Sequence, residues 1–141
     1  MGIIKKILIL SLLSFSLFGA ELEWAEDYEE GLAKAQKENK LLYVFVSSTS
    51  CPWCAKFERE VLTDEKAIKE LEKDYVAVHL MKEMDDIPEG YSARVIPRHY
   101  FSESNGKVFY TFAGYYDAVD FIDTLKEIKE EREENEIRTN K

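Results

Sequence analysis

Residues 41–62 read LLYVFVSSTSCPWCAKFEREVL. The first six residues form an unbroken apolar run rich in β-branched and aromatic side chains, which predicts a strand buried on both faces. Polar residues end this run, and Pro52 then occupies a favoured first position of a helix. The segment therefore predicts a buried strand that leads directly into a helix, with Cys51 and Cys54 at the start of that helix.

The rest of the chain alternates between helical and strand patterns. Apolar residues at helical spacing predict amphipathic helices, and short runs of β-branched and aromatic residues predict strands. Asn105-Gly106 predicts a tight hairpin turn between the last two strands. The predicted helices cover 24–40, 64–73 and the segments beginning at Pro52 and Val119, and the predicted strands cover 41–46, 75–81, 95–101 and 107–112.

This order of elements predicts an α/β fold in which a central mixed sheet is flanked by helices on both faces. Residues 21–141 contain no repeat and no Pro- or Gly-rich linker, so they are interpreted as one domain, with a frayed, solvated tail from about residue 133. The cysteines fall at the carboxyl end of a buried strand, where open α/β sheets place their chemistry.

Residues 1–20 have the organisation of a secretory signal peptide. Lys5 and Lys6 precede an uncharged apolar run that ends at Phe18 and is followed by Gly19 and Ala20. This run is shorter than the roughly 20 apolar residues of a membrane span, so we expect no stable span in the mature chain. The predicted location is the periplasm or the outside of the cell, and the cleavage point stays open because Phe18 is bulky.

The charge of the chain is strongly acidic. It contains 28 acidic and 19 basic residues, with a net charge of −9. Such a balance disfavours attraction to a phosphate backbone, so no nucleic-acid partner is expected.

Several motifs occur together along the chain. They are the strand LLYVFV before CPWC, the helix AKFEREVL, Ile96-Pro97, Asn105-Gly106 and Gly114. Together they resemble the thioredoxin superfamily, and more closely its exported members with an added amino-terminal helix. The resemblance covers nearly all of residues 21–141 and implies a thioredoxin-like fold and thiol-disulfide oxidoreductase activity.

The two cysteines suit this chemistry. A sulfur at a helix amino terminus is favoured as the thiolate, so Cys51 is the predicted nucleophile. Cys54 lies one turn further along and can resolve the mixed disulfide that Cys51 forms with a substrate. We expect no cofactor beyond this redox-active pair. The competing metal site would have two cysteines and two distant histidines, fewer ligands than zinc normally takes.

Four further residues are predicted to contact substrate. By the resemblance, Pro97 is a cis-proline that faces the active site, and Ile96 before it touches the substrate. Sequence alone also allows a trans proline on an edge strand. Pro52 and Trp53 lie between the cysteines, where they influence redox poise. Trp53 either touches partners or packs against the first helix.

One position departs from the family pattern. Many thioredoxins have a buried Asp six residues before the first cysteine, which takes part in proton transfer to the second one. Here that residue is Phe45, which cannot accept a proton. Glu58, four residues after Cys54 on the same helix, is the candidate replacement. Its alternative role is a solvated helix charge.

The sequence therefore predicts exchange of the CPWC pair with protein thiols outside the cytoplasm, leaning to a disulfide reductase that takes electrons from a membrane thiol donor. Ile96 before the proline resembles reducing thioredoxins, whereas proline followed by an aromatic residue between the cysteines occurs in several oxidising or glutathione-using relatives. A non-catalytic client-binding module in exported-protein or cytochrome maturation is the first alternative. A metal carrier is the second.

Overall fold

A computed structural model describes residues 20–141. The predicted signal peptide lies outside the described residues, except for Ala20. Within this part of the chain, no helix is long and apolar enough to cross a membrane. The elements are α1 (Tyr28–Glu38), β1 (Leu41–Ser47), α2 (Pro52–Glu60), α3 (Glu65–Asp74), β2 (Tyr75–Met81), β3 (Arg98–Ser102), β4 (Val108–Ala113) and α4 (Ala118–Thr139).

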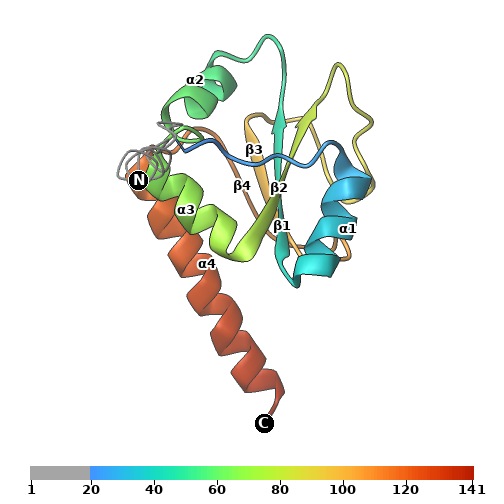
Figure 1. Ribbon diagram of the computed structural model, residues 1–141, viewed down its shortest axis with the longest axis vertical. Helices are drawn as coiled ribbons and strands as arrows, with labels where there is room; N and C mark the ends of the chain where they lie inside the picture. Colours follow the sequence, from blue (N-terminus) through green and yellow to red (C-terminus); the bar gives the residue numbers. More distant parts are fainter. Residues whose placement is uncertain (1–19) are drawn as a thin grey trace, which may run out of the picture.

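The four strands form one mixed sheet in the order β2-β1-β3-β4 (Figure 1). β1 lies in the interior, parallel to β2 and antiparallel to β3, and β4 pairs antiparallel with β3. A parallel pair next to a hairpin confirms the predicted mixed sheet.

Alternate residues of β1 face two separate cores. Tyr43 and Phe45 belong to the core that α2, α3 and α4 cover, whereas Leu42, Val44 and Val46 belong to the core beneath α1. All five side chains are fully buried. Figure 1 shows α1 on one side of the strands and α3 and α4 on the other. Coverage of both faces explains why β1 is apolar throughout rather than alternating with polar residues.

The first helix begins later than the sequence predicted. Trp24 does not belong to it but forms an isolated parallel bridge with Ala77 of β2. α1 begins at Tyr28 because Asp27 caps it, its carboxylate accepting a hydrogen bond from the N–H of Glu30 at 2.8 Å. The later start of α1 has a tertiary cause, because the bridge to β2 holds the residues before Asp27 in an extended path.

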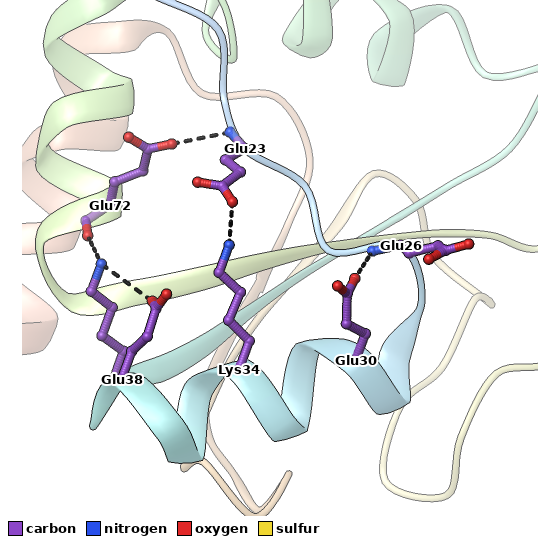
Figure 2. Close-up of polar contacts among 7 residues, drawn as sticks. Glu23, Glu26, Glu30, Lys34, Glu38 and Glu72 are labelled. Carbon is purple, nitrogen blue, oxygen red and sulfur yellow. Dashed lines mark hydrogen bonds and ion pairs between the residues drawn. The ribbon is translucent and has the colours of Figure 1, made fainter.

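Polar contacts join this extended segment to α1 and α3 (Figure 2). The N–H of Glu23 donates to the Glu72 carboxylate at 3.0 Å, and the Glu23 carboxylate accepts from Lys34. Lys40 donates to the Glu72 carbonyl at 2.8 Å and lies 3.8 Å from the Glu38 carboxylate. Exposed ion pairs add little stability individually, so the main effect of the network is to fix the path of the segment.

The hairpin between β3 and β4 is present, with a longer loop than a two-residue turn. Residues 103–107 connect the strands, and the N–H of Glu103 donates to the carbonyl of Lys107 at 2.9 Å. Gly106 has a φ of +85°, which glycine adopts without a steric penalty. The preceding strand begins at Arg98 rather than Val95, because its pairing with β1 starts there.

The carboxyl end of α4 is exposed to solvent. The helix continues to Thr139, with exposed side chains after Arg132. Pairs spaced i,i+4 stabilise this part: Arg132 lies 3.3 Å from Glu136, and Arg138 lies 3.4 Å from Glu134. In Figure 1 this end of α4 extends past the sheet.

Candidate active site

The cysteine pair lies where β1 gives way to α2. Cys51 is the residue that caps α2, and its sulfur accepts a hydrogen bond from the N–H of Cys54 at 3.2 Å. The two sulfurs form a disulfide. Cys51 is partly exposed, whereas Cys54 is only 1% exposed. A thiol from another molecule can therefore approach Cys51 but not Cys54.

The local electrostatics favour a negatively charged sulfur at Cys51. Pro52 occupies the first turn of α2, and that turn, which is fully described, contains no acidic residue. The free N–H groups and the positive end of the helix dipole therefore act on Cys51 without a competing carboxylate in the same turn. When the disulfide is reduced, this setting stabilises the thiolate.

The loop before β3 approaches the cysteines from the neighbouring strand. Arg98 pairs with Val46 at the end of β1, so Pro97 lies beside the point where β1 leads into the Cys51 loop. The Ile96–Pro97 peptide bond is cis, as the resemblance implied. Ile96 is half-buried and Pro97 is buried, and the Pro97 carbonyl accepts from the N–H of Gly114 at 2.9 Å.

Trp53 forms an exposed aromatic surface next to Cys51. Its side chain is 57% exposed, and its ring centroid lies 5.7 Å from that of Tyr115. The Lys56 ammonium lies 4.6 Å from the Tyr115 ring centroid and 5.3 Å from that of Trp53. Trp53 thus contacts the loop before α4 and not the first helix, which covers the other face of the sheet. It is available to a partner.

Both histidines of the chain flank Phe45. Phe45 pairs in register with His79 of β2 and with His99 of β3. Its ring centroid lies 5.0 Å from His79, 5.3 Å from His99 and 5.5 Å from Phe57 of α2. The position that holds an acid in many thioredoxins is therefore apolar here, with an imidazole on each neighbouring strand.

His99 is fully buried and has a partner at each ring nitrogen. Nε2 lies 3.1 Å from the carbonyl of Gly114, to which it must donate, and Nδ1 lies 2.8 Å from the hydroxyl of Tyr43. Burial lowers the pKa of His99 to about 3, so the ring is neutral at physiological pH. His99 connects β1 to the loop after β4.

His79 is more accessible and contacts α2. Its Nδ1 lies 3.7 Å from the Glu58 carboxylate, and its Nε2 lies 2.6 Å from the Ser47 hydroxyl. Burial lowers the pKa of His79, and the negative charges of Glu58 and Asp85 oppose that effect. The predicted proton acceptor Glu58 is thus half-exposed on the turn after Cys54, with its carboxylate directed at His79.

The comparison with family models agrees with this geometry. The model described as a thioredoxin-like domain matches residues 28–129. The chain belongs to the thioredoxin-like family. It has the disulfide-oxidoreductase type of thioredoxin-like fold with a CxxC pair.

Related proteins match at moderate to low identity. Anterior gradient protein 2 of Xenopus laevis is 32% identical over 84 residues, which cover 60% of this chain and 45% of that protein. The chain therefore spans about half the length of the curated relatives it matches.

Solved structures show the same architecture. A putative disulphide-isomerase from Bacteroides thetaiotaomicron superposes with a TM-score of 0.62 at 25% identity, covering 75% of this chain and 91% of that one. A thioredoxin from Thermus thermophilus gives a TM-score of 0.64 at 24% identity, covering 77% and 88%. The second similarity supports the fold alone.

This thioredoxin-like protein contains site residues that its sequence did not identify. Neither His79 nor Ser47 is among the site residues that the sequence predicts. The register of the sheet identifies the histidines as neighbours of the site, because it places both of them opposite Phe45. Within residues 20–141, no three His, Cys, Asp or Glu side chains are grouped as metal ligands.

Proposed function

We propose that this thioredoxin-like protein is a thiol-disulfide oxidoreductase that exchanges its CPWC pair with protein thiols outside the cytoplasm, in the direction of disulfide reduction. One observation carries the proposal: a partly exposed Cys51 at the head of α2 is joined to a buried Cys54 one turn away. This asymmetry gives each sulfur a separate role.

The exchange proceeds in two balanced steps from the reduced pair. The Cys51 thiolate attacks one sulfur of a substrate disulfide; a Cys51–substrate bond forms, and the other substrate sulfur leaves as a thiolate that takes up a proton. The Cys54 thiolate then attacks the Cys51 sulfur and displaces the first substrate sulfur. The substrate gains two electrons, and the protein is left with the Cys51–Cys54 disulfide.

The remaining parts of the proposal concern partners and location. A membrane-bound dithiol donor returns the protein disulfide to the reduced state, so no separate cofactor is required. Residues 1–20 support export to the periplasm or beyond, because a basic start precedes a short apolar run and small residues. Ile96 before the cis-proline supports the reducing direction by its resemblance to reducing thioredoxins.

Cysteine variants test the exchange chemistry. The protein should reduce insulin disulfides with dithiothreitol as electron source, and Cys51→Ser should remove this activity because it removes the attacking sulfur. Cys54→Ser should instead accumulate a covalent complex with substrate, visible on a non-reducing gel and released by excess thiol, because nothing resolves the mixed disulfide.

Two results would contradict this proposal. An intact protein that does not reduce insulin, together with a Cys54→Ser variant that traps no substrate, would instead support a client-binding module. Full activity in Cys51→Ser would show that the cysteine pair is not the reacting group. Circular dichroism of both variants should match the wild type, which excludes loss of folding as the cause.

A further inference from the structure

The resolving step requires Cys54 to lose a proton inside the protein. Cys54 is only 1% exposed, so bulk water has little access to its thiol. Phe45, in the position where many thioredoxins have an acid, offers no acceptor. Another group must take the proton for Cys54 to attack Cys51 at neutral pH.

Glu58 is placed to reach Cys54. Residues four apart on a helix lie on the same face, with Cβ atoms roughly 5–6 Å apart, and Glu58 follows Cys54 by this spacing on α2. This spacing places the Glu58 carboxylate on the side of α2 that carries the Cys54 thiol. Its side chain is 40% exposed, so it can pass a proton on to solvent.

His79 lies beside that carboxylate. Its Nδ1 lies 3.7 Å from the Glu58 Oε1, and the Ser47 hydroxyl, 2.6 Å from Nε2, orients the ring from the other side. Trp24 packs against the same ring with centroids 5.3 Å apart. The imidazole is therefore held between β1, the extended segment before α1, and α2.

We propose that Glu58 accepts the Cys54 proton during resolution and that His79 is the positioning residue that holds the Glu58 carboxylate for this transfer. This inference rests on the proposed exchange function. In the step, the Cys54 S–H bond breaks and the proton moves to Glu58. The Cys54 thiolate forms a bond with Cys51, and the bond between Cys51 and the substrate sulfur breaks.

The groups around His79 suit a positioning role. Charged side chains face His79 from α2, as Glu58, and from the loop after β2, as Asp85. Ser47, Phe45 and Trp24 also contact or pack against the ring. Its burial lowers its pKa, so the ring is neutral at pH 7 and does not tie up Glu58 in a strong ion pair.

His99 does not suit this role. It is fully buried, and both of its ring nitrogens already have partners in Tyr43 and Gly114. Neither nitrogen is directed at a group on α2. Of the two histidines, His79 alone therefore has an ionisable partner on the helix that carries Cys54.

Stopped-flow kinetics can isolate the resolving step. Reduced protein is mixed with an excess of a disulfide-linked cysteine peptide, and tryptophan fluorescence is followed, since Trp53 lies between the two cysteines. The phase that depends on peptide concentration reports attack by Cys51, and the phase that does not reports resolution by Cys54. Both are measured from pH 5 to pH 9.

In the wild type, the resolution rate should depend on pH less steeply than in Glu58→Gln, because a carboxylate takes the proton. Glu58→Gln should slow resolution at pH 7 by about 100-fold, the lower end of typical general-base effects, and the rate should then rise steadily with pH. His79→Leu should slow it by about tenfold, and His79→Gln, which keeps a hydrogen-bonding group, should recover part of that loss.

A double variant tests whether Glu58 and His79 act together, because the effects of residues that act together on one step do not add. The double variant Glu58→Gln/His79→Leu should resolve no more slowly than Glu58→Gln alone. Glu65→Gln, which removes an exposed charge from the start of α3, is the matched control and should leave both phases unchanged. The Cys51 phase in each variant is the internal control for folding of the site.

Three results would overturn the inference. A Glu58→Gln pH profile that coincides with the wild type would remove Glu58 as the acceptor. Equal slowing of both phases in His79→Leu would assign that residue a structural role only. A wild type with no peptide-dependent phase would overturn the proposed function itself, and this inference with it.

Discussion

His99 is the residue through which the core holds the loop that carries Pro97. It accepts from the Tyr43 hydroxyl and donates to the Gly114 carbonyl, and the N–H of Gly114 in turn donates to the Pro97 carbonyl. The cis-proline is thus tied to β1 by a short chain of hydrogen bonds. A charged imidazole in this apolar site would be costly, which is why burial lowers the pKa of His99 to about 3.

This burial predicts loss of stability in acid. An unfolded histidine has a pKa of about 6.5, so between that value and about 3 the unfolded chain binds a proton that folded His99 does not. The stability that neutral His99 contributes is therefore complete above pH 6.5 and falls as the pH drops. From this group we expect the free energy of unfolding in urea to be about 2 kcal/mol lower at pH 5 than at pH 7.

Variants separate this effect from other titrations. His99→Phe should be less stable at pH 7, because Gly114 loses its partner, yet its stability should fall less steeply between pH 7 and pH 5. His79→Gln controls for the second histidine, whose pKa is also lowered. An unchanged slope in His99→Phe would show that its protonation does not govern acid unfolding.

At the scale of elements, α1 approaches the sheet closely at a glycine. Gly31 is buried, and a Cβ built on it would lie 2.2 Å from Cγ2 of Val78 in β2. Val78 is fully buried and β-branched, so it has little freedom to move aside. The absence of a side chain at Gly31 therefore sets the distance between α1 and the sheet.

Gly31→Ala should destabilise the protein although alanine favours helices. Overpacking costs about 1–3 kcal/mol, which exceeds the helix-propensity gain of about 1 kcal/mol. In urea unfolding, Gly31→Ala/Val78→Ala should lose less stability than the sum of its single variants. Ala33→Ser, exposed on the same helix, is the control. A Gly31→Ala protein as stable as the wild type would contradict the close contact.

Local patterns predicted those elements whose structure depends on their own residues. The β1–α2 unit and the position of the two cysteines follow from a run of apolar residues and the CPWC motif, and the mixed sheet follows from the order of the elements. The predicted helical path of Trp24 was wrong, because its actual path depends on a bridge to Ala77, more than fifty residues away. The positions of His79 and His99 likewise depend on strand register, which a single sequence does not specify.

At the scale of the whole molecule, folding and redox state are linked. The disulfide joins the start of α2 to its own first turn, and Cys54 is part of the core that α2, α3 and α4 share with the sheet. Any difference in folding free energy between the oxidised and reduced proteins therefore appears in the reduction potential, at about 1.4 kcal/mol for each 30 mV.

The proposed direction predicts the value of that potential. A reductase should have a Cys51/Cys54 reduction potential close to that of thioredoxin, about −270 mV, and far from that of a strong oxidant, about −120 mV. Equilibration with graded dithiothreitol mixtures, followed by thiol alkylation, measures it. Glu65→Gln should give the same value. A potential near −120 mV would reverse the direction and leave the exchange chemistry intact.

The bridge between Trp24 and Ala77 also affects how molecules of this protein meet one another. The outer border of β2 is partly occupied by the chain's own leading residues, and the carbonyl of Ala77 already accepts from Ala25 at 2.9 Å. Exposed sheet borders invite pairing with foreign strands. Cleavage after residue 20 would keep Trp24 and Ala25 on this sheet edge, whereas removal of the chain through Ala25 would expose the edge and favour self-association.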